Sequence, residues 1–182
     1  MIKAAFVGFG EVNTPKEIIV KKCHDAAESL KKEGLDLIEV YPVTDDYEEK
    51  DIKMAIDALK GKDFDVLVVC IAGWIPTHAV VKVTEHFRHI PMVLWGLCGW
   101  TEGDRLVTTA DQAGTTAIRK TFYDLGYTFK YVYDIIGLPS KTKTVYNYAL
   151  AASAAAKLRH ARSKALHNSR KRLSRYNHTA YG

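Results

Sequence analysis

The segment that most constrains the fold is the run from residue 64 to residue 78, FDVLVVCIAGWIPTH. Its centre, Val66 to Ile71, is apolar at every position and rich in β-branched residues. A strand that is apolar on both faces is typical of the middle of a parallel sheet with helices on both sides. Gly73 follows the apolar run, and Pro76 stands where a helix would begin. The segment therefore predicts a buried central strand, a turn and a crossover helix, with Trp74 at the carboxyl end of the strand.

The rest of the chain alternates between short apolar runs and amphipathic stretches. Further strands are predicted at residues 3–7, 36–43, 91–96 and 129–135, and helices at residues 15–32, 52–59, 77–88, 109–125 and 141–162. Thr14 and Ser140 are expected to be N-caps, and residues 97–107 a glycine-rich loop. This alternation predicts a three-layer, doubly wound, parallel five-stranded sheet of the flavodoxin-like (Rossmann-like) class, with strand order 2-1-3-4-5.

The composition is that of an ordinary globular protein, with 47% hydrophobic and 26% charged residues. No stretch approaches the roughly 18 consecutive apolar residues of a membrane helix, so no membrane association is expected. The three cysteines, Cys23, Cys70 and Cys98, do not have the spacing of a zinc site, and their odd number does not suggest a set of disulfides. We expect them to be reduced and the protein to be cytoplasmic.

The net charge of +5 is confined to the end of the chain. Residues 163–182 contain five basic residues and no acid, whereas residues 1–162 hold 21 of each sign. We therefore expect a neutral α/β domain at residues 1–162 and a basic tail, frayed helix or disordered, at residues 163–182. The tail has no aromatic interleaving and matches no known module, so nucleic acid is not the expected partner.

Known cofactor motifs match poorly. Gly8-Phe9-Gly10 begins like a dinucleotide fingerprint, and Glu39 could hold a ribose hydroxyl, but the third glycine is missing. An NAD-binding oxidoreductase remains the weakest alternative. A P-loop, the hydroxyl-rich loop of FMN proteins and the acids of a response regulator do not occur.

The sequence also lacks a self-contained catalytic or metal-binding constellation. His78 and His86 are eight residues apart and His89 lies in the next turn, so they do not form the i, i+4 pair of a metal site. Cys98 has no evident base beside it. We expect this chain to hold no cofactor and no metal, and to contain no catalytic residue.

Three loops at the carboxyl ends of strands contain the candidate binding residues. They are Glu11, Asn13 and Thr14 after the first strand, Trp74 and His78 after the third, and Trp100, Thr101, Glu102 and Arg105 after the fourth. Indole faces next to hydroxyl, amide and carboxylate groups suit a sugar, whose C–H faces stack on the ring. Core packing of Trp74 and an ordinary exposed loop at residues 99–105 are the alternatives.

Three of these segments also resemble a known family. Phe6-Val-Gly-Phe-Gly-Glu-Val-Asn-Thr-Pro15, Ala72-Gly-Trp74 and Pro91-Met-Val-Leu-Trp-Gly96 are similar to the N-terminal domain of L-fucose isomerase-like proteins, relatives of fucose and arabinose isomerases. The resemblance covers residues 3–162. It implies an aldose–ketose isomerase that uses a divalent metal, usually manganese, bound by later domains. It also implies that the first domain helps to close the sugar pocket of a homo-oligomer, with Trp74 against the sugar.

The sequence departs from the family in two places. The loop Gly10 to Asn13 has no arginine, which true fucose isomerases carry there, and the polar segment after Arg162 replaces the strand that opens their second domain. The resemblance therefore predicts a truncated fragment that is inactive alone and serves as a substrate-pocket and oligomerisation domain. The alternative is a stand-alone α/β module that binds a sugar or a nucleotide.

Overall fold

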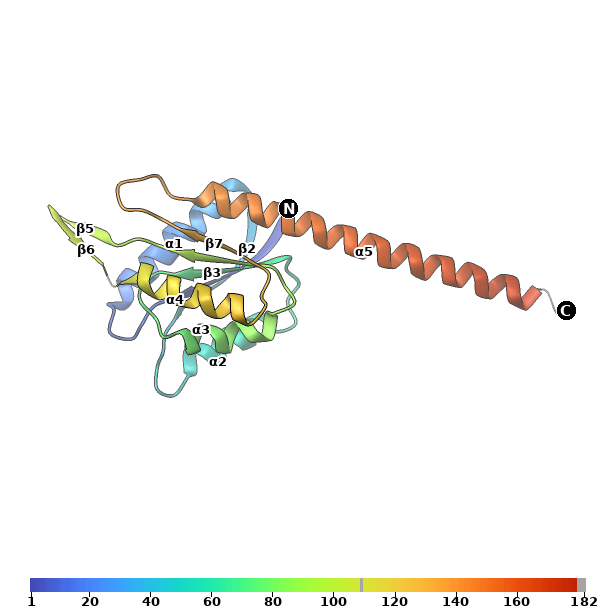
Figure 1. The fold of residues 1–182 in the computed structure, drawn as a ribbon, viewed down its shortest axis with the longest axis horizontal. Coiled ribbons are helices and arrows are strands. Elements are labelled where there is room, and N and C mark those ends of the chain that lie inside the picture. Colours follow the sequence, from blue (N-terminus) through green and yellow to red (C-terminus); the bar gives the residue numbers. More distant parts are fainter. Residues whose placement is uncertain (109, 180–182) are drawn as a thin grey trace.

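The polypeptide folds around one parallel sheet of five strands, with helices on both faces (Figure 1). The structure, a computed structural model of the chain, describes residues 1–108 and 110–179, with the side chains of residue 160 and residues 162–179 outside that description. The strands are β1 (Ile2–Phe9), β2 (Leu35–Val43), β3 (Val66–Ile71), β4 (Met92–Gly96) and β7 (Phe129–Tyr133). Their order is β2-β1-β3-β4-β7, and all neighbours are parallel. The predicted flavodoxin-like order is confirmed.

The helices form two layers. They are α1 (Lys16–Glu33), α2 (Lys50–Leu59), α3 (Thr77–Thr84), α4 (Asp111–Asp124) and α5 (Thr142–Thr179). A 3₁₀ turn, Glu85–Phe87, follows α3. Apolar side chains of α1 and α5 pack in the core on one face of the sheet, and those of α2, α3 and α4 pack in the core on the other. The chain therefore changes face between α1 and α2 and returns to the first face with α5, as doubly wound topology requires.

The central strand β3 is buried along its whole length, as its sequence predicts. Leu67, Val69 and Ile71 belong to the core under α2, α3 and α4. The alternating residues, among them Val68 and Cys70, belong to the core under α1 and α5. Because successive side chains of a strand point to opposite faces, a run without polar residues fills both cores at once.

The segment predicted as a glycine-rich loop contains a small hairpin. Strands β5 (Trp100–Glu102) and β6 (Arg105–Val107) pair antiparallel, separate from the main sheet. The fifth predicted strand also ends early, at Tyr133 rather than residue 135. Tyr133 lies opposite Gly96, the last residue of β4, so the strand has no partner beyond it in the described sheet. The carboxylate of Asp134, the next residue, accepts a hydrogen bond from the backbone N–H of Lys141, 3.0 Å away.

Both predicted N-caps are wrong. Helix α1 begins at Lys16 with Pro15 in the N-cap position and no side-chain capping bond. The hydroxyl of Thr14 is buried and has no hydrogen-bond partner among the described residues. Ser140 lies two residues before α5, and its hydroxyl donates to Asp134 Oδ2, 3.0 Å away, rather than capping the helix.

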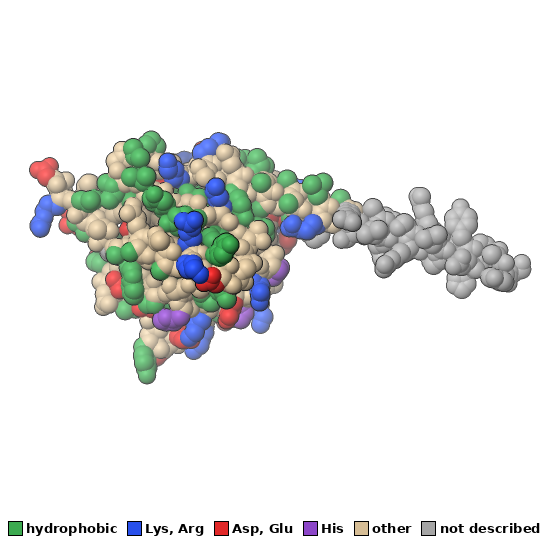
Figure 2. Space-filling model, viewed as in Figure 1, with side chains coloured by type: hydrophobic (Ala, Val, Ile, Leu, Met, Phe, Trp, Pro, Cys, Tyr) green, Lys and Arg blue, Asp and Glu red, His purple; other side chains and the backbone are tan. Residues whose placement is uncertain are grey.

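Helix α5 packs on the body through its first half. Val145, Ala149, Ala152 and Ala156 are buried at i, i+3 and i+4 spacing, and the small alanines allow close contact with the sheet and α1. The helical backbone continues to Thr179, beyond the predicted end at Arg162, and extends away from the body (Figure 1). No helix in the described part of the chain combines the length and apolar character needed to cross a bilayer. On the face shown in Figure 2, acidic and basic side chains of the body are interspersed.

Candidate functional site

The loops after β1 and β3 meet at the carboxyl edge of the sheet. The backbone N–H of Glu11 donates a hydrogen bond to the carbonyl oxygen of Trp74, 2.8 Å away. Since β1 and β3 are neighbours and their crossover helices lie on opposite faces, this contact is at the topological switch point, where ligands bind in open α/β sheets. The structure therefore brings together two of the predicted site residues at the position that the fold favours for a ligand.

The Trp74 side chain is not part of either hydrophobic core. It is 36% exposed, whereas the following residue, Ile75, is 1% exposed and fills the core. One edge of the indole lies against Gly114 of α4, where a Cβ atom would be 3.4 Å from Trp74 Cδ1. The residue that packs in the core is therefore Ile75 and not Trp74. The indole of Trp74 keeps a surface that a ligand can reach.

The other predicted residues of these two loops differ in their accessibility. Asn13 and His78 are exposed, and Glu11 is half-buried. Thr14 is 4% exposed and points its hydroxyl into the protein, so it does not contribute to an accessible surface. Of the predicted residues in these two loops, Glu11, Asn13, Trp74 and His78 thus keep accessible surface.

The predicted residues after β4 lie on the hairpin. Trp100 Nε1 donates to Glu102 Oε1 at 2.9 Å, and Glu102 is directly opposite Arg105 in the β5–β6 pairing. Both charged residues are exposed. The Lys22 ammonium of α1 lies 5.7 Å from the centre of the Trp100 ring. Through that contact the hairpin is connected to α1 and to a cavity beneath it.

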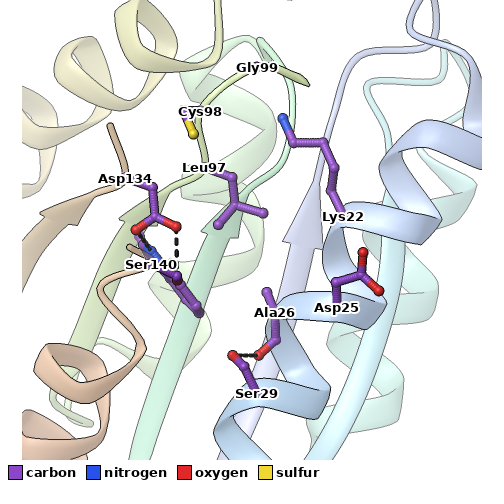
Figure 3. Close-up of a pocket in the computed structure, with 10 residues that line it drawn as sticks. Lys22, Asp25, Ala26, Ser29, Leu97, Cys98, Gly99, Asp134 and Ser140 are labelled. Carbon is purple, nitrogen blue, oxygen red and sulfur yellow. Dashed lines mark hydrogen bonds between the residues drawn. The ribbon is translucent and has the colours of Figure 1, made fainter. Parts of the chain in front are cut away.

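This cavity was not predicted from the sequence. It has a volume of about 250 Å³ and lies between α1 and the carboxyl ends of β4 and β7. Figure 3 shows Lys22 and Asp25 of α1 on one side and Asp134 and Ser140 on the other. It is lined by Lys22, Asp25, Ala26, Ser29, Trp95, Leu97, Cys98, Gly99, Asp134 and Ser140.

Lys22 is held across the sheet edge by a buried ion pair. Its Nζ lies 2.8 Å from Asp111 Oδ2 in the first turn of α4, and the two side chains are 12% and 1% exposed. Asp111 Oδ1 also accepts a hydrogen bond from the backbone N–H of Gln112 at 3.1 Å. The pair joins α1 to α4 and fixes the ammonium group at the mouth of the cavity.

Asp134 forms the opposite wall, and its carboxylate is already occupied by the protein. Oδ1 accepts from Trp95 Nε1 at 3.1 Å and from the Lys141 backbone N–H at 3.0 Å. Oδ2 accepts from the Ser140 hydroxyl at 3.0 Å. With three donors directed at it, this carboxylate is a structural acceptor rather than a free acid.

The remaining polar group of interest is the thiol of Cys98, which is half-buried. Burial raises its pKa, and the carboxylate of Asp134 raises it further, while Lys22 opposes them. The thiol is therefore protonated at neutral pH. A protonated thiol is a poor nucleophile, so we treat Cys98 as a lining residue of the cavity.

The glycines after β1 have a packing role. A Cβ atom on Gly8 would lie 2.3 Å from Cys23 Sγ, and one on Gly10 would lie 2.6 Å from Ile19 Cδ1. Both contacts are with α1, so these glycines allow the helix to approach the strand.

Glu39 forms an ion pair with Lys31 and accepts a hydrogen bond from the Tyr41 hydroxyl at 2.9 Å. Its carboxylate is thus engaged by Lys31 and Tyr41 rather than free to accept a hydrogen bond from a ribose hydroxyl.

Within the described residues, no group of three or more His, Cys, Asp or Glu side chains is placed to hold a metal ion. The manganese implied by the family resemblance therefore has no binding site among them. A sequence signal for the cavity did exist in α1, where Lys22, Ala26 and Ser29 follow one another at i, i+4 and i+7 along a face that otherwise packs.

No protein-family model matches the chain, and no curated protein is significantly similar to it in sequence.

Proposed function

We propose that this chain is the substrate-pocket and oligomerisation domain of a metal-dependent aldose–ketose isomerase of the fucose and arabinose isomerase type. On this proposal it contributes one wall of a sugar pocket and does not catalyse isomerisation alone. The observation that supports the proposal most is the indole of Trp74, which is 36% exposed and lies at the switch point beside the loop of Glu11.

The chemistry of this surface suits a polyhydroxylated ligand. An indole face binds the C–H groups of a pyranose or an open-chain sugar, because they present an apolar surface to the ring. The carboxylate of Glu11 can accept hydrogen bonds from sugar hydroxyls, and the side chains of Asn13 and His78 are exposed nearby in the chain. A single open wall binds weakly, since much of the sugar stays in water.

On this proposal, the chain itself supplies neither the metal nor the groups that transfer protons. The described residues do not fit a divalent metal, so the reacting carbons would be handled by other domains or subunits. This chain would orient the sugar, with an indole ring on which the sugar stacks and acceptors that favour one pattern of sugar hydroxyls over another.

The first test is a sugar titration of the full chain, with tryptophan fluorescence and calorimetry as the two readouts. L-Fucose, L-arabinose and their ketose partners are the probes, and we expect binding at about 1 mM or weaker for the best of them. Trp74→Ala should abolish this response, whereas the matched variant Trp100→Ala should retain it. Equal loss in both variants, or retention in Trp74→Ala, would contradict the proposal. Sugar isomerisation by the purified chain with manganese would refute its second part.

A second candidate function is a stand-alone binding module that uses the cavity. The cavity lies within the folded chain, between α1 and the carboxyl ends of β4 and β7. Pockets for drug-sized ligands have volumes of about 300–1,000 Å³. A cavity of about 250 Å³ therefore suits a monosaccharide better than a nucleotide.

The two candidates are distinguished by a variant on α1. Asp25 is exposed and its ion pair with Lys21 lies at the surface, so its replacement should not affect folding. Asp25→Leu narrows the cavity and removes a carboxylate, and Asp25→Asn keeps the size. The stand-alone module predicts that Asp25→Leu abolishes ligand binding and that Trp74→Ala does not.

A further inference from the structure

Among the residues that the structure describes, no strand pairs with the outer edge of β7, and the hydrogen-bonding groups of this edge can be assigned residue by residue. At one end of the strand, the Met92 N–H donates to the Thr128 carbonyl oxygen at 2.9 Å, and at the other end the Asp134 N–H donates to the Gly96 carbonyl oxygen at 2.9 Å. Even-numbered residues therefore direct their backbone groups toward β4. Because strand geometry alternates, the odd-numbered residues Phe129, Tyr131 and Tyr133 direct theirs outward.

The same three residues place aromatic rings on the α4 face of the sheet. The Tyr131 and Tyr133 rings lie 5.6 Å apart, and the Phe129 ring meets the Phe122 ring edge-on at 5.5 Å. The guanidinium of Arg119 lies 4.9 Å from the centre of the Tyr131 ring. The edge thus offers a row of aromatic side chains together with outward backbone donors and acceptors.

We propose that this edge pairs with β7 of a second copy of the chain, in an antiparallel register centred on Tyr131. In that register Tyr131 faces Tyr131 of the partner, and Phe129 faces Tyr133. These are the residues whose N–H and C=O groups point outward, so each facing pair exchanges two hydrogen bonds. The five residues of each strand overlap completely, and the sheet continues across the twofold axis.

The side chains of β7 favour a second copy of β7, rather than an unrelated strand, as the partner at this edge. Aromatic residues face aromatic residues at each hydrogen-bonded position, and such cross-strand pairs stabilise antiparallel sheets. The one charged residue of the strand, Lys130, faces the apolar Val132. A register shifted by one residue along each strand would instead place Lys130 opposite its own copy. The sequence of β7 is therefore complementary to itself in one register.

Features around the strand agree with a covered edge. Tyr133 is 41% exposed, and Ile135 and Leu138, which follow the strand, are 40% and 55% exposed. The opposite edge of the sheet, β2, contains Pro42, which has no N–H to offer. This inference extends the oligomerisation role proposed above, but it does not depend on sugar binding.

The test uses the full chain in sedimentation equilibrium from roughly 1 to 500 µM. We expect the average mass to rise with concentration from 20.4 kDa toward twice that value. Tyr133→Pro removes an outward N–H and the Tyr133 ring, and it leaves the hydrogen bonds between β7 and β4 in place, so it should keep the circular dichroism spectrum and weaken the dimer at least tenfold. Val132→Pro is the matched control, because it removes an N–H that is bonded to β4 and should disturb the fold.

A cross-link tests the register. In a Cys98→Ser background, Tyr131→Cys should give a disulfide-linked dimer on mild oxidation with diamide, because this position faces itself. Lys130→Cys, which faces Val132, should give far less. A monomer at every concentration, a dimer unaffected by Tyr133→Pro, or equal cross-linking at both positions would overturn the inference. Sugar binding measured on the Tyr133→Pro variant tests the Trp74 surface without the dimer. Failure of the dimer proposal can therefore be distinguished from failure of the sugar-binding proposal.

Discussion

Asp134→Ala should be the most informative single substitution for the stability of the carboxyl edge. The carboxylate accepts three hydrogen bonds, from Trp95 Nε1, the Ser140 hydroxyl and the Lys141 N–H. Trp95 is completely buried, so its indole N–H cannot turn to water when the acceptor is removed. Leaving such a donor unsatisfied costs about 1–3 kcal/mol. The other two donors lie nearer the surface and can be hydrated, which costs less.

We therefore expect Asp134→Ala to lower the free energy of unfolding by about 2–4 kcal/mol. That is a large share of the roughly 5–15 kcal/mol by which domains of this size are stable. The assay is urea unfolding followed by far-ultraviolet circular dichroism, which does not depend on the tryptophan environment. Asp134→Asn is the control that keeps an acceptor oxygen and the size of the side chain, and it should cost clearly less.

A double-mutant cycle with Trp95→Phe isolates the buried contact. Phenylalanine has no N–H, so only the two donors nearer the surface, the Ser140 hydroxyl and the Lys141 N–H, lose their acceptor when Asp134 is then replaced. The cost of Asp134→Ala should fall by about 1–3 kcal/mol in the Trp95→Phe background. A cost under about 0.5 kcal/mol in the wild-type background, or no coupling between the two positions, would refute the reasoning.

Three further predictions concern α1 and the cavity. Lys22→Met leaves the buried Asp111 carboxylate without its cation and should lower the free energy of unfolding by about 3 kcal/mol in the urea assay; no loss would mean that the pair is not buried in solution. Gly8→Ala places a Cβ atom 2.3 Å from Cys23 Sγ and 2.9 Å from Tyr41 Cβ and should cost about 1–3 kcal/mol, of which the additional change Cys23→Ala should restore only a part, because the contact with Tyr41 remains. Alkylation of Cys98 by iodoacetamide should reach its half-maximal rate above the pH of about 8.5 typical of a free thiol, because its pKa is raised; a lower midpoint would contradict that shift.

The sheet could be predicted from the sequence because its signals are local. The apolar run Val66 to Ile71 identifies the central strand by itself, and the spacing between the other runs is the length of a crossover helix. The hairpin at residues 100–107 was missed because its strands have three residues each, too few for an alternating pattern to stand out.

The errors at the helix starts have a different cause. Thr14 and Ser140 are residue types that cap helices, and nothing in the local sequence distinguishes them from true caps. Ser140 is instead bonded to Asp134, a residue that the fold brings to it from the end of β7. The choice between capping and this bond is decided by tertiary structure, which a local pattern does not contain.

The candidate site was predictable only in part, for a similar reason. The contact between Glu11 and Trp74 follows from strand order, since the loops after two adjacent parallel strands must meet. The cavity depends on Lys22 reaching Asp111, 89 positions later in the chain. A lysine on a helix has many possible partners, and its spacing alone does not select one.

The carboxyl edge thus offers two separate places for a small ligand, and Cys98 distinguishes between them. Its thiol lines the cavity, whereas Trp74 lies at the switch point between β1 and β3, outside the set of residues that line it. A sugar that binds on Trp74 should change the indole fluorescence and leave the rate of Cys98 alkylation unchanged. A ligand that enters the cavity should slow alkylation, and Trp74→Ala should not prevent that protection. If the sugar that responds to Trp74→Ala also protected Cys98, the two places would form one continuous site, and the division of the edge inferred from the structure would be wrong.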